Sequence, residues 1–288
     1  MKVGAVFPQL ESGVDPIAIR DYAQAVEGLG YNHLLIYDHV LGASTATRPD
    51  WSGPYSSESV FHEPFVLYGY LAGLTKTIEL VTAVIILPQR QTALVAKQAA
   101  EVDLLSGGRL RLGVGVGWNA VEYEGLNEHF GDRGVRSEEQ IALLRALWAE
   151  PVVKFKGRWH TIDNAGINPL PPRRSIPIWI GGYSEATLQR VGAMGDGWFP
   201  WRAPNDDMRA QIGRLHDYAR AAGRDPAAIG LEPQLSVGRL PEQEWEGYVG
   251  GWQQLGATHL CVNTMGAGLR SLDEHIAMLR TVKERLGL

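Results

Sequence analysis

The chain has 288 residues, of which 45% are hydrophobic and 20% are charged, and its formal net charge is −5. This composition is that of an ordinary soluble globular protein, and it offers no basic surface for a nucleic-acid backbone or an anionic membrane. The sequence has no run of about 18 apolar residues, so we expect no membrane span, and we expect no signal peptide. It has one cysteine, Cys261, which excludes an internal disulfide. We therefore expect a cytoplasmic protein with this thiol buried in the core.

Strand-like and helix-like segments alternate along the whole chain. Residues 3–8 form the first predicted strand, and Asp15 followed by Pro16 predicts the start of a helix. The other predicted strands span residues 33–38, 78–87, 110–113, 178–180, 197–200, 229–235 and 259–262. Further helix starts are predicted at Thr92, Asn119 (with Glu122 at capping-box spacing), Asn205, Pro241 and Ser271. Eight β-then-α units predict a (β/α)₈ TIM barrel of parallel strands, built as one domain over residues 1–288.

Two stretches interrupt this alternation. Residues 42–61 are polar and follow the second predicted strand. Residues 152–162 contain the turn pair Lys156-Gly157 and precede the fifth predicted strand. We therefore expect two insertions, a long functional loop after strand two and a hairpin before strand five.

In a barrel of this kind, chemistry takes place at the carboxyl ends of the strands. The second predicted strand ends there in Asp38-His39. A histidine beside a carboxylate can be held in one tautomer, and its ordinary pKa of about 6.5 suits proton transfer near neutral pH. We predict His39 as the catalytic acid–base residue, with Asp38 orienting its ring. The alternative is that Asp38 caps the next loop and His39 only packs.

Three further patterns bear on cofactor binding. Gly181-Gly182-Tyr183-Ser184 follows the fifth strand and opens a helix, so its backbone N–H groups are a candidate phosphate cradle. An ordinary tight turn with Ser184 as the N-cap fits the same residues. Gly115, Gly117 and Ala120 match the Rossmann pattern G-x-G-x-x-A, but three βα units precede them and no acidic strand end follows, so we reject that fold. The histidines are scattered without ligand spacing, and we predict no metal site.

Two blocks of the sequence resemble the bacterial luciferase-like monooxygenase superfamily. Residues 80–90, 96–100, 103–109 and 112–118 are similar to its central signature, and residues 177–182 with 192–198 resemble its second signature. The resemblance covers nearly the whole chain and is strongest to the actinobacterial branch of F420-dependent oxidoreductases. It implies a TIM barrel and, since dimers dominate among the relatives, a homodimer.

The resemblance also implies the residues of the site. F420-binding members carry a β-bulge with a non-prolyl cis peptide at the place of Thr82-Ala83-Val84, and a histidine that contacts the cofactor at the place of His39. The expected cofactor is coenzyme F420, with FMN as the alternative. It is expected to lie against Asp38, Ala83, Val84, Gly117, Gly181, Gly182, Tyr183 and Ser184.

One departure from the relatives concerns the substrate. F420-dependent glucose-6-phosphate dehydrogenases have a catalytic glutamate where this chain has Trp118, which disfavours sugar-phosphate oxidation. Trp118, Trp198 and Trp201 predict a pocket for a small apolar or aromatic molecule. The expected function is hydride transfer between F420 and such a substrate. The alternatives are an FMN-dependent monooxygenase that uses reduced flavin and O₂, and an inactive cofactor-binding protein.

Overall fold

Parallel strand pairing dominates the computed structural model, which describes residues 1–287. The strands of its large sheet are β1 (Lys2–Val6), β2 (His33–Ile36), β3 (Glu79–Thr82), β4 (Ile85–Ile86), β5 (Leu110–Gly115), β8 (Ile178–Gly181), β9 (Gly197–Phe199), β10 (Gly230–Leu231), β11 (Gln234–Ser236) and β12 (His259–Asn263). They pair in the order β10-β9-β8-β5-β3-β2-β1-β12-β11, and β4 also pairs with β5. Gly4 of β1, for example, lies opposite Cys261 of β12 on one side and His33 of β2 on the other.

The two ends of this strand order are neighbours in the chain, which closes the sheet into a barrel. Glu232 and Pro233 alone separate β10 from β11, so this stretch acts as one bent strand that pairs with β9 on one side and β12 on the other. β3 and β4 also share one position, because Ala83 and Val84 interrupt the strand and the peptide between them is cis. Residues 1–287 therefore form eight strand positions. This confirms the predicted barrel and the expected break in strand three.

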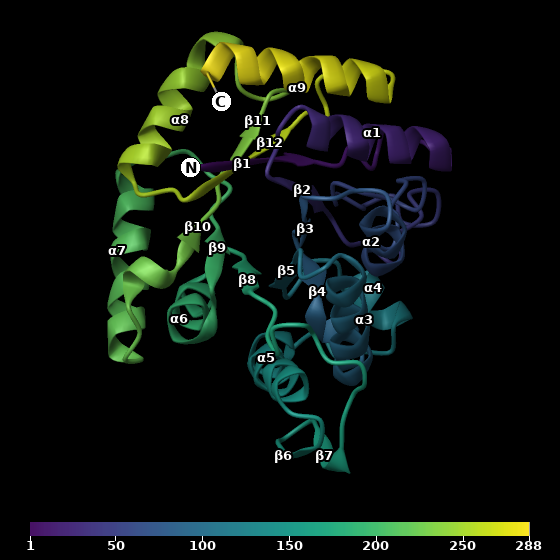
Figure 1. Cartoon of the computed structure of the whole chain (residues 1–288), viewed down its shortest axis with the longest axis vertical. Coiled ribbons are helices and arrows are strands. Elements are labelled where there is room, and N and C mark those ends of the chain that lie inside the picture. Colours follow the sequence, from purple (N-terminus) through teal and green to yellow (C-terminus); the bar gives the residue numbers. More distant parts are fainter. Residues whose placement is uncertain (288) are drawn as a thin grey trace.

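The helices lie outside the strands (Figure 1). They are α1 (Pro16–Gly28), α2 (Pro64–Ala72), α3 (Thr92–Leu105), α4 (Ala120–Gly125), α5 (Arg133–Ala149), α6 (Glu185–Met194), α7 (Asp206–Ala221), α8 (Trp245–Gln254) and α9 (Leu272–Leu286). As predicted, Asp15 caps α1 by accepting the Ile17 N–H, and Asn205 caps α7 by accepting the Met208 N–H. Within the described residues, no helix is both long and apolar enough to cross a membrane.

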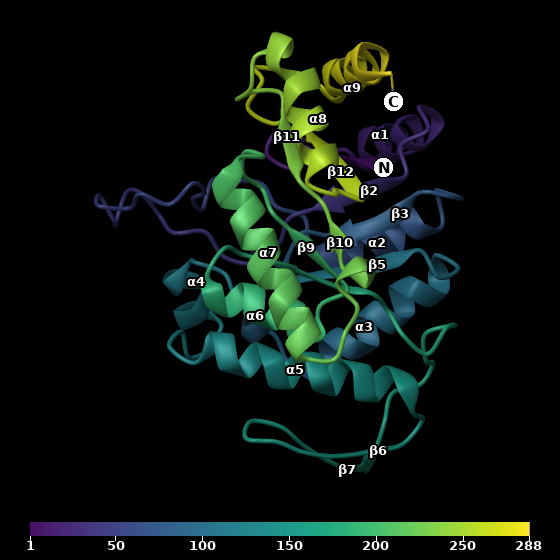
Figure 2. The same cartoon turned by 90° about the vertical axis from the view of Figure 1, so that its left-hand side faces the viewer.

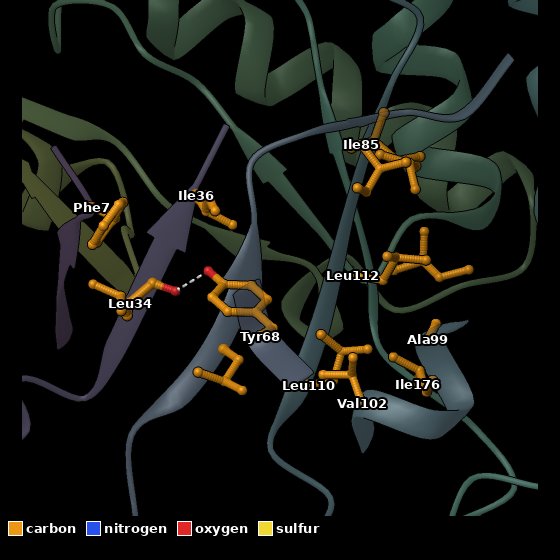
Figure 3. Close-up of a cluster of buried hydrophobic side chains, with 14 of the residues drawn as sticks. Phe7, Leu34, Ile36, Tyr68, Ile85, Ala99, Val102, Leu110, Leu112 and Ile176 are labelled. Atoms are coloured by element: carbon orange, nitrogen blue, oxygen red, sulfur yellow. Dashed lines mark hydrogen bonds between the residues drawn. The ribbon is translucent and has the colours of Figure 1, made fainter. Parts of the chain in front are cut away.

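Successive residues of each strand face opposite sides, and the two sides pack into separate hydrophobic clusters. Leu34 and Ile36 of β2 belong to the larger cluster, between strands and helices, whereas Leu35 lies in the smaller cluster inside the barrel. Figure 3 shows part of the larger cluster, where the Tyr68 hydroxyl donates to the Leu34 carbonyl at 2.7 Å. Cys261 lies fully buried in the inner cluster, and burial raises the pKa of its thiol. The structure thus confirms the expected packing role of this cysteine.

A charged network fills the barrel at the amino ends of the strands. The Arg111 guanidinium pairs with Glu232 and, at 3.0 Å, with Glu79, and His33 Nε2 lies 2.6 Å from the Glu232 carboxylate. Burial by itself raises the pKa of Glu232, but the charges of Arg111 and His33 outweigh it and lower this pKa to about 2. The network lies at the end of the barrel opposite to the strand ends where chemistry is expected.

Two segments extend beyond the barrel. Residues 37–63 run from β2 to α2 without helix or strand, and this long loop extends to the left of Figure 2, on the side of α4. An antiparallel hairpin of β6 (Val153–Lys156) and β7 (Thr161–Ala165) lies between α5 and β8 in the chain, at the bottom of both views. α4 comes directly after β5 in the chain and therefore lies at the carboxyl ends of the strands. The long loop, on the side of α4, lies at the same end of the barrel.

Candidate active site

A cavity of about 700 Å³ opens at the carboxyl ends of the barrel strands. This volume lies in the range of small-molecule and cofactor sites. All predicted site residues except Ser184 and Trp198 line the cavity, namely Asp38, His39, Ala83, Val84, Gly117, Trp118, Gly181, Gly182, Tyr183 and Trp201. Residues from widely separated strand ends therefore face one common space.

Trp198 is not a pocket residue, contrary to the prediction. Its side chain is fully buried in the larger cluster, between strands and helices, and its Nε1–H donates to the Gly182 carbonyl oxygen at 2.8 Å. The next residue, Phe199, belongs to the inner cluster and lines the cavity. Adjacent residues of a strand face opposite sides, so the sequence pattern selects the wrong one of two neighbouring aromatic residues.

Asp38 does not orient the His39 ring, contrary to the prediction. Its carboxylate is 1% exposed and binds the Arg90 guanidinium through both oxygens, at 2.7 and 3.2 Å. It also accepts the Ile86 N–H at 3.0 Å. Arg90 in turn donates to Glu63, the residue that caps α2, at 2.9 Å. Asp38 thus anchors the third strand position beside the cavity through a paired, buried charge.

Glu122 of α4 takes the place expected of Asp38. Its side chain is 1% exposed, its two oxygens lie 3.2 and 3.3 Å from His39 Nδ1, and Oε1 accepts the Val40 N–H at 2.8 Å. Burial raises the pKa of this carboxyl, but the hydrogen bond and charge of His39 and the backbone N–H groups of Leu41 and Val40 lower it below its ordinary value. A carboxylate only accepts, so Nδ1 carries a proton and Nε2 is the ring nitrogen left for a bound molecule.

The sequence contains a signal for Glu122, but that signal points elsewhere. Asn119 and Glu122 have the spacing of a capping box, in which the glutamate would reach back to the helix start. Asn119 does cap α4, by accepting the Val121 N–H at 3.1 Å. Glu122 instead crosses to the segment that follows β2, and no local pattern indicates this contact.

Aromatic rings surround His39 on the side of the long loop. The ring centroids of Tyr55, Phe61 and Trp118 lie 4.8, 4.7 and 5.8 Å from the imidazole. Trp51, which also belongs to the long loop, packs against Trp118 with the ring centroids 5.8 Å apart. Trp118 therefore lies in an apolar wall, as predicted. Tyr55 and Phe61 were missed, although they belong to the loop that the sequence marks as functional.

Glycines allow β5 and β8 to approach the Val84 side chain. A Cβ added to Gly115 would lie 2.4 Å from Val84 Cγ2, and one added to Gly181 would lie 3.0 Å from Cγ1. Gly182 has a φ of 124°, which side-chain-bearing residues rarely adopt. Ser184 caps α6 by accepting the Thr187 N–H at 3.2 Å and does not line the cavity. The turn itself is therefore part of the cavity wall, and the Ser184 hydroxyl serves the helix.

A polar part of the lining was also missed by sequence reasoning. Tyr37, Gln234 and Asn263 form a hydrogen-bonded group, and Arg239 lies nearby on the segment after β11. Tyr37 and Asn263 stand at predicted strand ends, which is the one sequence signal that could have indicated them. Across residues 1–287, no three His, Cys, Asp or Glu side chains are grouped so as to hold a metal ion.

Comparison with known proteins finds relatives along the whole chain. The profile of the luciferase-like monooxygenase family matches residues 2–284. An uncharacterised protein of Mycobacterium tuberculosis is 32% identical over 207 residues, which cover 70% of this chain and 71% of that protein. An FMNH₂-dependent dimethylsulfone monooxygenase of Pseudomonas fluorescens is 29% identical over 228 residues, 78% of this chain and 58% of its own. The solved structure of an F420-dependent secondary alcohol dehydrogenase with an F420-acetone adduct is similar at a TM-score of 0.79 and 17% identity, covering 99% of this chain and 98% of the other.

Proposed function

The chain belongs to the luciferase-like monooxygenase family, and we propose that it transfers a hydride between coenzyme F420 and a small apolar or aromatic substrate. One observation carries the proposal: His39 lines the cavity and is fixed through Nδ1 by Glu122, so that Nε2 can exchange a proton with a bound molecule. When a hydride leaves or joins the carbon of an alcohol or carbonyl group, a proton moves at the attached oxygen. An oriented imidazole suits that step.

The residues of the cavity fit a flat, phosphate-bearing cofactor. Ala83, Val84 and Ile86 supply an apolar surface, and a Cβ on Gly117 would lie 2.8 Å from Ile86 Cγ2, so glycine keeps this wall close. Residues 181–183 line the cavity just before α6, where backbone N–H groups and the helix dipole favour an anion. We propose that residues 181–183 hold the cofactor phosphate. We further propose that Asp38, through its bonds to Arg90 and the Ile86 N–H, keeps Ala83 and Val84 in place against the cofactor ring.

When bound, a deazaflavin supplies a ring carbon that accepts or gives a hydride. The chain's own residues perform the remaining tasks. His39 takes the proton of a substrate hydroxyl at Nε2, or returns it in the opposite direction. Glu122 stabilises the resulting imidazolium through the Nδ1–H hydrogen bond. Tyr55, Phe61 and Trp118 keep water away from this proton transfer.

A second candidate is an FMN-dependent monooxygenase that uses reduced flavin and O₂. It is favoured by the 29% identity to the FMNH₂-dependent enzyme of Pseudomonas fluorescens. A third, an inactive cofactor-binding protein, finds less support, since such a protein would not need the buried carboxylate that fixes His39.

Titration of the full-length protein with F420 and with FMN tests the cofactor assignment. We expect F420 to bind at least about tenfold more tightly than FMN, an advantage of about 1.4 kcal/mol, and a panel of alcohols to include one that reduces the bound F420. Binding is read from cofactor fluorescence, and reduction from the loss of the absorbance of oxidised F420. Tighter FMN binding with O₂ consumption would establish the monooxygenase instead, and binding without turnover of either kind would establish the inactive protein.

A further inference from the structure

The polar part of the cavity lining holds a hydroxyl proton without an acceptor. The Met265 backbone N–H can only donate, and it donates to Asn263 Oδ1 at 2.9 Å, so Asn263 Nδ2 is the donor side of that amide. Nδ2 donates to Gln234 Oε1 at 3.2 Å, which makes Gln234 Nε2 a donor to the Tyr37 hydroxyl oxygen at 2.7 Å. Asn263 Nδ2 also lies 3.3 Å from this oxygen. Tyr37 therefore accepts from two amides, and its own proton is left for a ligand.

Two further donors belong to the same part of the cavity. Trp201 packs against Tyr37 with ring centroids 5.5 Å apart, and its buried indole N–H has no hydrogen-bond partner within residues 1–287. Arg239 donates its backbone N–H to the Ser236 carbonyl, and its guanidinium enters no ion pair in the described chain. Arg239 lines the cavity together with Tyr37 and Tyr55. Burial raises the pKa of both tyrosine hydroxyls, and the positive charge of Arg239 opposes this rise.

No free carboxylate balances these donors. Asp38 is the one carboxylate among the described residues that line the cavity, and Arg90 and the Ile86 N–H occupy its oxygens. Glu122 is bound to His39 and the backbone beside it. A neutral apolar ligand would leave the buried Trp201 indole N–H and the Tyr37 hydroxyl proton without an acceptor. It would also leave the exposed Arg239 guanidinium without a counter-charge, whereas an anion with several acceptor sites would satisfy all three.

We propose that Tyr37, Trp201 and Arg239 form an anion subsite and that the substrate carries a carboxylate there, with its apolar body against Tyr55 and Trp118. A guanidinium binds a carboxylate through a fork of two N–H groups, and the remaining lone pairs can accept from a hydroxyl and an indole N–H. The inference rests on the proposed function, because the subsite lies in the same cavity as the proposed cofactor. It narrows the substrate to a small acid with an aryl or alkyl body and a hydroxyl or carbonyl group for His39.

Calorimetric titration of the full-length protein tests the subsite without knowledge of the natural substrate. The probes are phenylacetate and 3-phenylpropionate, each compared with its neutral amide and measured in the presence of whichever cofactor binds. We expect the wild type to bind the carboxylates about 10- to 100-fold more tightly than the amides. Arg239→Gln and Tyr37→Phe should each lower carboxylate affinity at least about tenfold and lower amide affinity much less, because the neutral amide offers no charge to Arg239 and one carbonyl oxygen to Tyr37. The matched control is Arg270→Gln, which removes the same charge from an exposed position at the same end of the barrel.

The outcomes separate the subsite from the cofactor site. The inference would be overturned if the wild type bound acid and amide with equal affinity, or if it bound neither acid saturably. It would also be overturned if the ratio of carboxylate affinity to amide affinity were unchanged in both variants. So would a loss of FMN or F420 affinity in Arg239→Gln with unchanged affinity for riboflavin or a phosphate-free deazaflavin, because Arg239 would then serve the cofactor phosphate. Failure of the wild type to bind either cofactor would contradict the proposed function. Cofactor binding is measured separately, in the fluorescence titration with F420 and FMN.

Discussion

Replacement of His39 by alanine should lower kcat about 10²- to 10⁴-fold while cofactor affinity stays close to that of the wild type. In the proposed mechanism, the loss follows from removal of the ring nitrogen that exchanges the substrate proton. Ala83 and Val84, which are proposed to contact the cofactor, remain in place. The measurement is single-wavelength kinetics of F420 reduction with a substrate found in the alcohol panel, together with a fluorescence titration for the cofactor. His129→Ala is the matched control, because the His129 side chain is 76% exposed outside the cavity.

A comparison at Glu122 separates proton transfer from ring orientation. Glu122→Gln keeps an oxygen that can accept the Val40 N–H but removes the charge that stabilises the imidazolium, so we expect a smaller loss of kcat than in His39→Ala. Glu122→Ala removes both and should approach the His39 variant. Full turnover in His39→Ala would make this histidine structural and transfer the proton to another group, such as the Tyr183 hydroxyl or a bound water.

Glu232→Gln should lower the free energy of unfolding by about 3–5 kcal/mol, because it removes the buried counter-charge of the Arg111 guanidinium and leaves only the partly exposed Glu79 carboxylate. The Arg111 side chain is 2% exposed and the Glu232 side chain fully buried, so water cannot replace the lost interaction. The measurement is urea unfolding followed by circular dichroism. Arg214→Gln is the matched control: it breaks an exposed pair with Glu185, whose partners are each 46% exposed, and should cost less than about 1 kcal/mol. Equal, small effects of the two substitutions would contradict a stabilising role of the network.

The same residue gives stability a defined dependence on acid pH. The pKa of Glu232 is lowered in the folded protein from 4.5 to about 2. A carboxyl with a depressed pKa stabilises the folded state above its ordinary pKa, and that contribution is lost as pH falls from about 4.5 towards about 2. The wild type should therefore lose stability over this window in acid titrations. Glu232→Gln should start from a lower stability and lose less over the same window.

The architecture was predictable because its signals are local. Each strand is a short apolar segment, each helix start has its own cap, and the side chains of Asp15 and Asn205 bind N–H groups two and three residues away. Closure of eight such units into a barrel follows from their number and order. The position of the site was predictable for the same reason, since the carboxyl end of a strand can be read from the strand itself.

The partners of the site residues depended on the tertiary structure. Asp38 and His39 are adjacent, yet their side chains bind groups 52 and 83 residues away, Arg90 and Glu122. Adjacency in the sequence therefore does not give these two side chains a common partner. In β9, where successive residues point to opposite sides, Trp198 lies on the outside of the barrel and Phe199 on the inside. The eight units, and the strand ends at which polar residues gather, can be read from the sequence alone. Which polar groups meet there was decided by barrel closure, because their hydrogen bonds join segments that come together only when the chain is fully folded.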